Sequence, residues 1–421
     1  MPSIPRRGLI AALAVVAMAS ALIAYSAPLG TDYLAPPCHP YVCDDAGPAI
    51  AALAAGKPHD FFANQPPMGA FSLLVRAPFA AVGKLAGGTD LTIYRLGAFA
   101  CVLALGLLAI SLMSAMVRRR RALAACLLVP VAVLVSPLTY SALQYGHPEE
   151  LLGAALCAGA AIAATRGRGL LAGAMLGCAI ATKQWAALAI LPVLLAAPRG
   201  TRLRLGVAAG GFAALLFVPM IVADPGRFWL AQKSVGIATT FQHTVTASNL
   251  WFPFAHGSTA PTLTPHGIDV TTMYSISSGL GNVTHPLAIL VALALTGAYA
   301  LRRRGAAPEE ALQLLALVFL VRCLLDPLTY SYHHAPFLVA LTAYEGLRRR
   351  VPVLTGFAFA AILTMTHVIA PLNDAVLVNV FYLCWAVPLA VVLAVCVLAP
   401  GRAEAVARRL RLERALAPQA A

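Results

Sequence analysis

The sequence predicts an all-α polytopic membrane protein with about 12 transmembrane helices packed in one bundle. Its 421 residues are 60% hydrophobic and 11% charged, a balance outside the range of soluble domains. Apolar stretches of about twenty residues, long enough to cross a bilayer, recur from end to end. Arginine clusters alternate along the chain with polar segments that have none. These observations predict one membrane domain rather than several soluble ones.

Each predicted span is an apolar run bounded by charged or turn-forming residues. In chain order the spans are 8–28, 92–117, 122–138, 149–164, 170–182, 185–198, 205–223, 286–301, 309–325, 335–347, 351–371 and 375–398. The bundle covers residues 1–400, with long outer segments at 29–91 and 224–285 and a basic tail at 401–421. Two pairs of short spans meet at Lys183 and at Asp326–His334, and short helices that face water tolerate charged side chains.

The basic residues predict the orientation of the bundle. Of the 30 lysines and arginines, 22 lie in clusters between spans or at the chain ends: Arg6-Arg7, Arg118 to Arg121, Arg166 and Arg168, Arg199 with Arg202 and Arg204, Arg302 to Arg304, Arg348 to Arg350, and Arg402 to Arg414. The positive-inside rule places these clusters and both termini in the cytoplasm of a plasma-membrane protein. Eleven of the 16 acids and all ten histidines then lie outside, so chemistry is expected at the outer face. The net charge of +14 indicates topology and contact with anionic membrane lipids, not nucleic-acid binding.

The two long outer segments are predicted to carry short structural elements of their own. Ala46–Ala55 has the composition of a short helix. Met68–Leu85 is an apolar stretch interrupted by Arg76 and Lys84, which favours a helix lying along the outer leaflet. The segment 224–285 is rich in aromatics, which suit a lid or an acceptor platform; interfacial anchoring by Trp and Phe is the alternative.

The order of residues in the outer loop resembles a known family. An acid pair, Asp44-Asp45, precedes an alanine-rich stretch and then Gln65-Pro66-Pro67; Lys183-Gln-Trp and the late stretch Tyr330-Ser-Tyr-His-His-Ala-Pro336 follow. This pattern resembles the GT-C superfamily of membrane glycosyltransferases, and most closely glycosyltransferase family 87, a mannosyltransferase-like family. The resemblance implies a GT-C-like bundle that moves a hexose, mannose in the first instance, from a polyprenyl phosphate to a lipid or cell-envelope glycan with inversion. The lipid-linked sugar is the donor substrate, and no further cofactor is expected.

Asp44 and Asp45 are the candidates for the catalytic base. The resemblance assigns this role to a first-loop acid, and a carboxylate that takes the proton of an attacking hydroxyl typically accelerates transfer by about 10²–10⁴-fold. The alternative is that they cap the helix beginning near Ala46, because aspartate is a favoured N-cap. One residue of the pair can serve each purpose.

The donor phosphate gains charge as its bond to the sugar breaks, and preorganised cations stabilise that charge best. The candidates for this role are Lys183, His147, Arg322, His333 and His334. An ionisable group such as Lys183 at membrane depth is costly and indicates function, although snorkelling to the interface is the alternative. For Arg322 the alternative is a salt bridge to Asp326 one helical turn later.

The candidate substrate-binding residues carry hydrogen-bonding groups suited to sugar hydroxyls: Gln65, Glu149, Glu150, Tyr330 and Tyr332. Gln65 stands where the family usually has a tyrosine before the Pro-Pro pair. For Glu149 and Glu150 the alternative is stabilisation of the first helical turn after Pro148. No metal site is expected, because no histidine spacing matches a helical two-histidine motif and adjacent histidines point about a hundred degrees apart.

A multi-span transporter is the alternative function, since about twelve spans with both termini inside is also a common carrier plan. Carriers usually show repeat symmetry and polar residues at the midplane of the membrane. This chain shows neither clearly, and its polar residues concentrate in the outer segments. A glycosyltransferase is therefore the favoured prediction.

Overall fold

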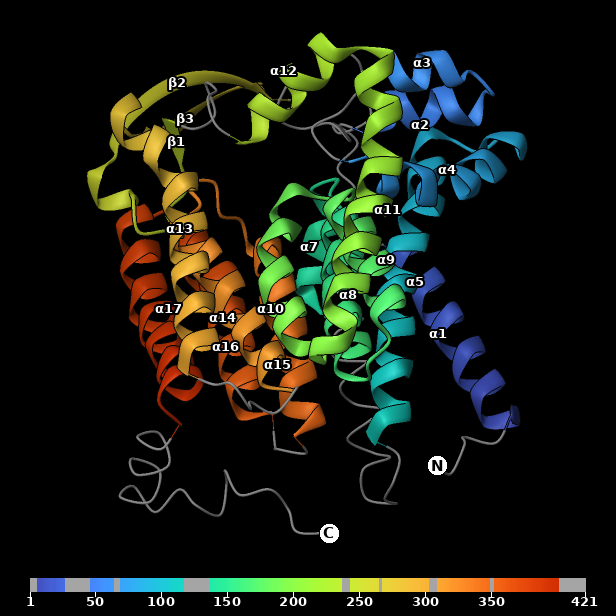
Figure 1. Cartoon of the computed structure of the whole chain (residues 1–421). Helices are drawn as coiled ribbons and strands as arrows, with labels where there is room; N and C mark the ends of the chain where they lie inside the picture. Colours follow the sequence, from blue (N-terminus) through green and yellow to red (C-terminus); the bar gives the residue numbers. More distant parts are fainter. Residues whose placement is uncertain are drawn as a thin grey trace.

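The computed structural model is a helical bundle with a layer of shorter elements across one end (Figure 1). It describes residues 6–26, 46–63, 69–116, 136–236, 243–264, 267–302, 309–348 and 352–400. Asp44, Asp45, Gln65 and the basic tail 401–421 lie outside the described residues. Predictions that concern them therefore stay predictions.

Helices match the predicted spans over most of the chain. The elements of the bundle are α1 (Arg6–Ser26), α5 (Asp90–Met116), α7 (Pro137–Gln144), α8 (Glu149–Thr165), α9 (Gly169–Ile180), η2 (Gln184–Ala189) with α10 (Ile190–Ala196), η3 (Arg199–Thr201) with α11 (Arg202–Ala223), α13 (Ser278–Arg302), α14 (Glu310–Leu325), η6 (Ser331–His334) with α15 (Ala335–Leu347), α16 (Val353–Thr364) with η7 (Met365–Ile369) and η8 (Ala370–Leu372), and α17 (Ala375–Leu398). By length and composition, five described helices can cross a membrane. The predicted span 122–138 falls mostly outside the described residues, so the number of about 12 stays a prediction.

Three helices form the centre of the bundle. α8, α14 and α15 are buried along almost their whole length, and their neighbours pack on all sides of them. Alanine and glycine dominate α8, and small side chains let helix backbones approach closely. By contrast, α11 is apolar, but only 17% of the residues in its most hydrophobic stretch are buried. This low burial is expected of a helix that faces lipid. The central helices therefore carry the interior of the protein, and α8, α14 and α15 each place a buried ionisable side chain there.

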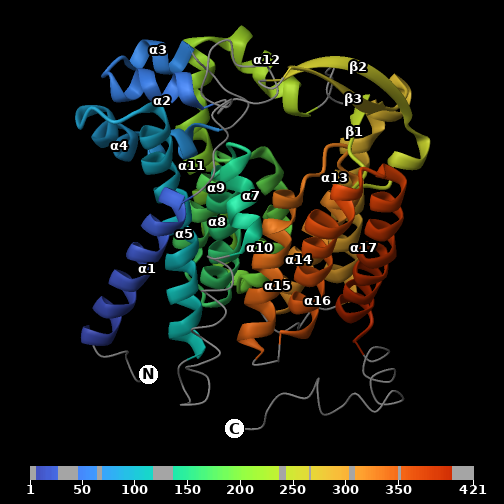
Figure 2. The same cartoon turned by 180° about the vertical axis from the view of Figure 1, so that it is seen from behind.

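The shorter elements gather at one end of the bundle, which we call the sheet end. They are α2 (Gly47–Ala54), α3 (Pro58–Ala63), α4 (Ala70–Leu85), α12 (Pro225–Gly236) and a small β-sheet. Figure 2 shows the same arrangement from behind, and in both views α1 begins and α17 ends at the opposite end. The helices predicted at 46–55 and 68–85 are confirmed as α2 and α4.

The all-α prediction is wrong for the second outer segment, which carries a three-stranded antiparallel sheet. Its strands are β1 (Thr244–Val245), β2 (His256–Thr264) and β3 (Gly267–Ser275) in the order β1-β3-β2, with His256 opposite Ser275. Threonine, valine and isoleucine recur in this region, and β-branched residues favour strands. Pro261 is tolerated because β2 is an edge strand, where a missing N–H donor costs little.

The segment that leads into β2 is anchored to the bundle by buried polar contacts. Trp251 Nε1 donates a hydrogen bond to the Leu325 carbonyl at 2.6 Å, and Asn249 Nδ2 donates to the Pro327 carbonyl at 2.7 Å. Asn379 of α17 donates to the carbonyls of Ala247 and Asn249, each at 2.8 Å. Trp251 is thus a buried anchor rather than an open platform residue.

Candidate functional site

The site is organised around the junction of α9 and η2, where the chain turns at Lys183. The start of α4 docks on this turn: Gly69 N donates to the Thr182 carbonyl at 3.0 Å and Phe71 N to the Ala181 carbonyl at 2.9 Å. A Cβ at Gly69 would lie 2.1 Å from the Ala181 carbonyl oxygen, so only glycine allows this approach. The docking places α4 beside the first turn of α8.

Glu149 in the first turn of α8 is the centre of a buried ionic network. Its Oε1 lies 3.0 Å from Lys183 Nζ and 3.0 Å from His147 Nδ1, and its Oε2 lies 3.8 Å from Arg76 Nη1. The side chains of Glu149 and Arg76 are both completely buried. A buried carboxylate is tolerated when cations compensate it, and here Arg76 and Lys183 come from two separate parts of the chain.

Glu150 extends the network toward α14. It lies 3.7 Å from Lys183 Nζ and 4.0 Å from Arg322 Nη1. Arg322 also contacts Asp326, at 3.8 Å, and its guanidinium lies 5.1 Å from the centre of the Trp185 ring. We call the assembled group the ionic cluster: Arg76, His147, Glu149, Glu150, Lys183, Arg322 and Asp326. Its three arginine or lysine cations face three carboxylates, so the described part is close to electrically neutral.

The sequence predicted most of these residues and, of their partners, only Asp326 for Arg322. Lys183 does not extend into the surroundings as a snorkelling lysine would, because its amine contacts two carboxylates and its side chain is 17% exposed. Glu149 and Glu150 occupy the first helical turn and also belong to the cluster. The Arg322–Asp326 salt bridge forms as expected of an i, i+4 pair.

Arg76 is the cluster residue that the sequence reasoning missed as a site residue. It was expected on a helix along the outer leaflet, yet its side chain is completely buried against Glu149 and lies 5.7 Å from the Tyr94 ring centre. Gly97 on α5 lies beside the Arg76 side chain, at a distance where an added Cβ would be in ordinary van der Waals contact. The available signal was an arginine inside an apolar stretch, which indicates function in a membrane protein.

The paired histidines of η6 face different surroundings. His333 packs against the Tyr332 ring with centres 4.5 Å apart, on the side of the cluster. His334 is completely buried on the other side, with Nε2 3.2 Å from the Tyr382 hydroxyl and Nδ1 3.1 Å from the Ser331 carbonyl. The structure therefore brings His333, but not His334, toward the residues predicted to bind phosphate.

Both histidines lie in the turn between α14 and α15, and burial lowers the pKa of each ring. Burial lowers the pKa of His334 to about 4. Burial, followed by the charge of Arg322, lowers the pKa of His333 well below its usual range. In the protein without a bound anion, both rings are therefore uncharged at neutral pH.

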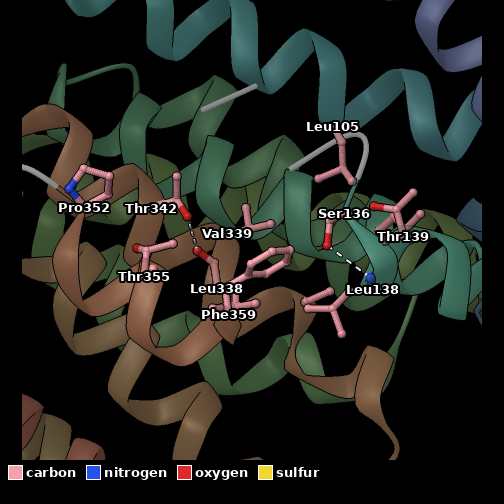
Figure 3. Close-up of a pocket in the computed structure, with 13 residues that line it drawn as sticks. Leu105, Ser136, Leu138, Thr139, Leu338, Val339, Thr342, Pro352, Thr355 and Phe359 are labelled. Carbon is pink, nitrogen blue, oxygen red and sulfur yellow. Dashed lines mark hydrogen bonds between the residues drawn. The ribbon is translucent and has the colours of Figure 1, made fainter. Parts of the chain in front are cut away.

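A separate apolar cavity of about 220 Å³ lies deeper in the bundle (Figure 3). Its described lining comes from α5, α7, α8, α15 and α16 and includes no charged side chain: Leu105, Ser136, Leu138, Thr139, Leu151, Ala335, Leu338, Val339, Thr342, Pro352, Thr355, Gly356 and Phe359. The polar atoms of two lining residues are used locally: Thr342 donates to the Leu338 carbonyl and Ser136 accepts from Leu138 N. The cavity is therefore distinct from the ionic cluster. Among the described residues, no group of three His, Cys, Asp or Glu side chains is arranged to hold a metal ion.

Comparison with known families places this geometry in context. The family model described as "Glycosyltransferase family 87" matches residues 66–327, more than half of the chain. The chain belongs to glycosyltransferase family 87. The predicted family is thereby confirmed, and as a member the protein is a membrane glycosyltransferase. The whole ionic cluster lies within the matched residues, whereas Asp44, Asp45 and Gln65 precede them.

Two solved structures resemble the overall fold. ArnT from Cupriavidus metallidurans is 20% identical with a TM-score of 0.44, and the alignment covers 96% of this chain and 72% of ArnT. The arabinofuranosyltransferase AftD from mycobacteria is 18% identical with a TM-score of 0.42, and the alignment covers 92% of this chain and 27% of AftD. A search of curated proteins gives no match.

Proposed function

We propose that this glycosyltransferase moves a hexose, mannose in the first instance, from a polyprenyl phosphate to a lipid or cell-envelope glycan. The transfer takes place at the outer face of the plasma membrane and inverts the anomeric centre. The observation that supports this proposal is the ionic cluster, in which cations from α4, the Lys183 turn and α14 meet at the first turn of α8. The outward orientation of the sheet end rests on the distribution of arginines.

Lys183 is the cation best placed to hold the donor phosphate. Its side chain is 17% exposed, whereas that of Arg322 is 9% exposed and that of Arg76 is completely buried. Lys183 contacts the phosphate directly, and Arg322 lies beside Lys183. Arg76 pairs with Glu149, which in turn positions Lys183. As the sugar–phosphate bond breaks, the charge on the leaving phosphate is stabilised by cations that are already in position.

Glu149 and Glu150 act as counter-ions that fix these cations. Their side chains are almost completely buried and engaged with Lys183, Arg76 and Arg322. This burial favours a positioning role over the direct contact with sugar hydroxyls suggested by the sequence. Gln65 and Tyr330 keep the proposed role of substrate contacts, whereas the buried Tyr332, 3% exposed, supports the parallel ring of Tyr330.

The base is Asp44 or Asp45. The acceptor oxygen attacks the anomeric carbon, its proton passes to the carboxylate, and the bond to the phosphate oxygen breaks to release the polyprenyl phosphate. Asp45 directly precedes Ala46 and α2, and α2 belongs to the sheet end together with α4, which supplies Arg76 to the ionic cluster. A carboxylate in this part of the chain suits the proton transfer.

The test is transfer by the purified protein given polyprenyl-phosphate mannose and membrane lipid extract as acceptor. Replacing the base with asparagine, in Asp44→Asn or Asp45→Asn, lowers turnover by about 10²–10⁴-fold at normal protein levels. Lys183→Ala raises the KM for the donor more than that for the acceptor, while the exposed Lys84→Ala leaves both unchanged. Full activity of both single aspartate variants and of the double variant would refute the assignment of the base.

A further inference from the structure

Beside the ionic cluster, three tyrosine rings and one imidazole form a continuous aromatic surface. The ring centres of Tyr145, Tyr330 and Tyr332 are 5.7–5.9 Å apart in every pairing, and Tyr330 and Tyr332 are parallel within 5°. The imidazole of His147 lies 5.3 Å from Tyr332. We call these four residues the aromatic platform. His147 belongs both to this platform and to the ionic cluster.

The platform is open on one side and supported on the other. Tyr145 is 41% and Tyr330 40% exposed, whereas Tyr332 is buried beneath them at 3%. Tyr145 ends α7 and Tyr330 precedes η6, two elements far apart in the sequence. A hydrogen bond of 2.8 Å between the hydroxyls of Ser141 and Ser331 ties these elements together. The exposed rings are therefore held in a fixed relation to each other before any ligand binds.

Tyrosines near a membrane surface commonly serve as interfacial anchors. Anchors need only place an amphipathic ring at the level of the lipid headgroups. Here the rings instead pack on one another and lead through His147 to Glu149, which lies 3.0 Å away and also holds Lys183. This arrangement fits a ligand with an apolar face next to an anionic group.

We propose that Tyr145 and Tyr330 form a sugar-binding subsite, on which the C–H face of a hexose ring stacks. The proposal rests on the glycosyltransferase function proposed above and adds a residue, Tyr145, and a mode of recognition to it. The face of an aromatic ring carries partial negative charge, and the C–H groups on one side of a hexose are weakly positive. A sugar on these rings places an attached phosphate toward Lys183. The sugar comes from the donor or from a glycan acceptor, and the experiment distinguishes the two.

The first arm compares the dissociation constants of polyprenyl-phosphate mannose and polyprenyl phosphate for the purified full-length protein in detergent. Tyr145→Leu and Tyr330→Leu keep apolar volume but remove the aromatic face, and each reduces the preference for the glycosylated lipid by about 3- to 10-fold. Tyr145→Phe and Tyr330→Phe keep that preference. Lys183→Ala weakens both lipids alike, and the exposed control Trp229→Leu on α12 changes neither.

The second arm measures saturation transfer from the protein to methyl α-mannoside by NMR, with polyprenyl phosphate present. A loss of this signal in the leucine variants, with donor preference unchanged, assigns the subsite to the acceptor sugar. If the leucine variants match the wild type in both arms, the subsite is refuted. If the wild type binds neither lipid, the proposed donor is wrong, and the methyl mannoside signal still decides the subsite. Gel filtration and thermal unfolding confirm that each variant is folded.

Discussion

The ionic cluster and the apolar cavity share one helix, α8, but differ completely in chemistry. On α8, Glu149 and Glu150 belong to the cluster, and the next residue, Leu151, lines the cavity. On α15, the cavity residues begin at Ala335, directly after His334. The first turn of α8 therefore belongs to the ionic cluster, whereas the lining of the cavity, from Leu151 onward on the same helix, contains no charged side chain. The comparison shows how this bundle accommodates charge: the residues of the ionic cluster are gathered in one group in which carboxylates face cations, apart from the apolar cavity.

The two regions also differ in what a substitution leaves behind. Removing one member of a buried ion pair leaves its partner charged and desolvated. Replacing a cavity-lining side chain by one of equal size changes little, since the neighbouring space is already empty. The following variants test this contrast, in decreasing order of expected effect.

Glu149→Leu has the largest expected effect. It leaves Lys183 and Arg76 without their shared carboxylate and lowers the free energy of unfolding by about 3–5 kcal/mol, the usual cost of breaking a buried ion pair. Denaturant unfolding in detergent measures this loss. Glu149→Gln keeps the shape and hydrogen-bonding oxygen and loses less, and Asp90→Leu at an exposed site changes stability little. A Glu149→Leu protein as stable as the wild type contradicts the counter-ion role.

Gly69→Ala tests how α4 is attached to the cluster. The added methyl group clashes with the Ala181 carbonyl oxygen, and the displacement of α4 costs about 1–3 kcal/mol, as overpacking does elsewhere. Because Arg76 moves with α4, the KM for the donor rises as well. The control is Gly206→Ala on α11, where no atom lies within 4 Å of the new methyl group. Equal behaviour of the two variants in thermal unfolding and donor titration rules out the proposed docking role.

Arg322→Lys keeps the positive charge but replaces the planar guanidinium with a compact ammonium group. A lysine amine lacks the planar fork that reaches both Glu150 and Asp326 and lies against Trp185, so stability falls by about 1–2 kcal/mol. Unfolding curves and donor KM are the measurements. Wild-type values for both in Arg322→Lys would show that charge alone suffices at this position.

Thr342→Val in the apolar cavity has the smallest expected effect. The change preserves volume and removes one hydrogen bond within α15, so stability changes by less than about 1 kcal/mol. Turnover and donor KM stay at wild-type values. A rise in donor KM would show that the cavity belongs to the substrate site and would remove the contrast between the two regions.

The sequence allowed most of the site to be anticipated, for a physical reason. Lys183, Arg322 and the Glu149-Glu150 pair are conspicuous because ionisable groups in apolar surroundings are costly and require an explanation. Their pairing was not predictable, since it brings together residues from different helices, up to more than 100 positions apart, as between Glu150 and Arg322. Arg76 was noticed only as an interruption of an apolar stretch, and its burial depends on contacts with α5 and α8. The β-sheet was missed because its short strands lie in a segment whose threonines, prolines and glycines also suit irregular loops.

The sequence by itself determined that this protein lies in a membrane, which family it resembles and which residue types are available for chemistry. Those properties follow from composition, apolar length and local order, all of which are encoded along the chain. Only the tertiary structure decided that Glu149 is a shared counter-ion, that Arg76 belongs to the cluster and that His333 and His334 face opposite sides. The physical reason is that burial and pairing of charge depend on how helices distant in sequence pack, through contacts such as that of Gly69 with the Ala181–Thr182 turn.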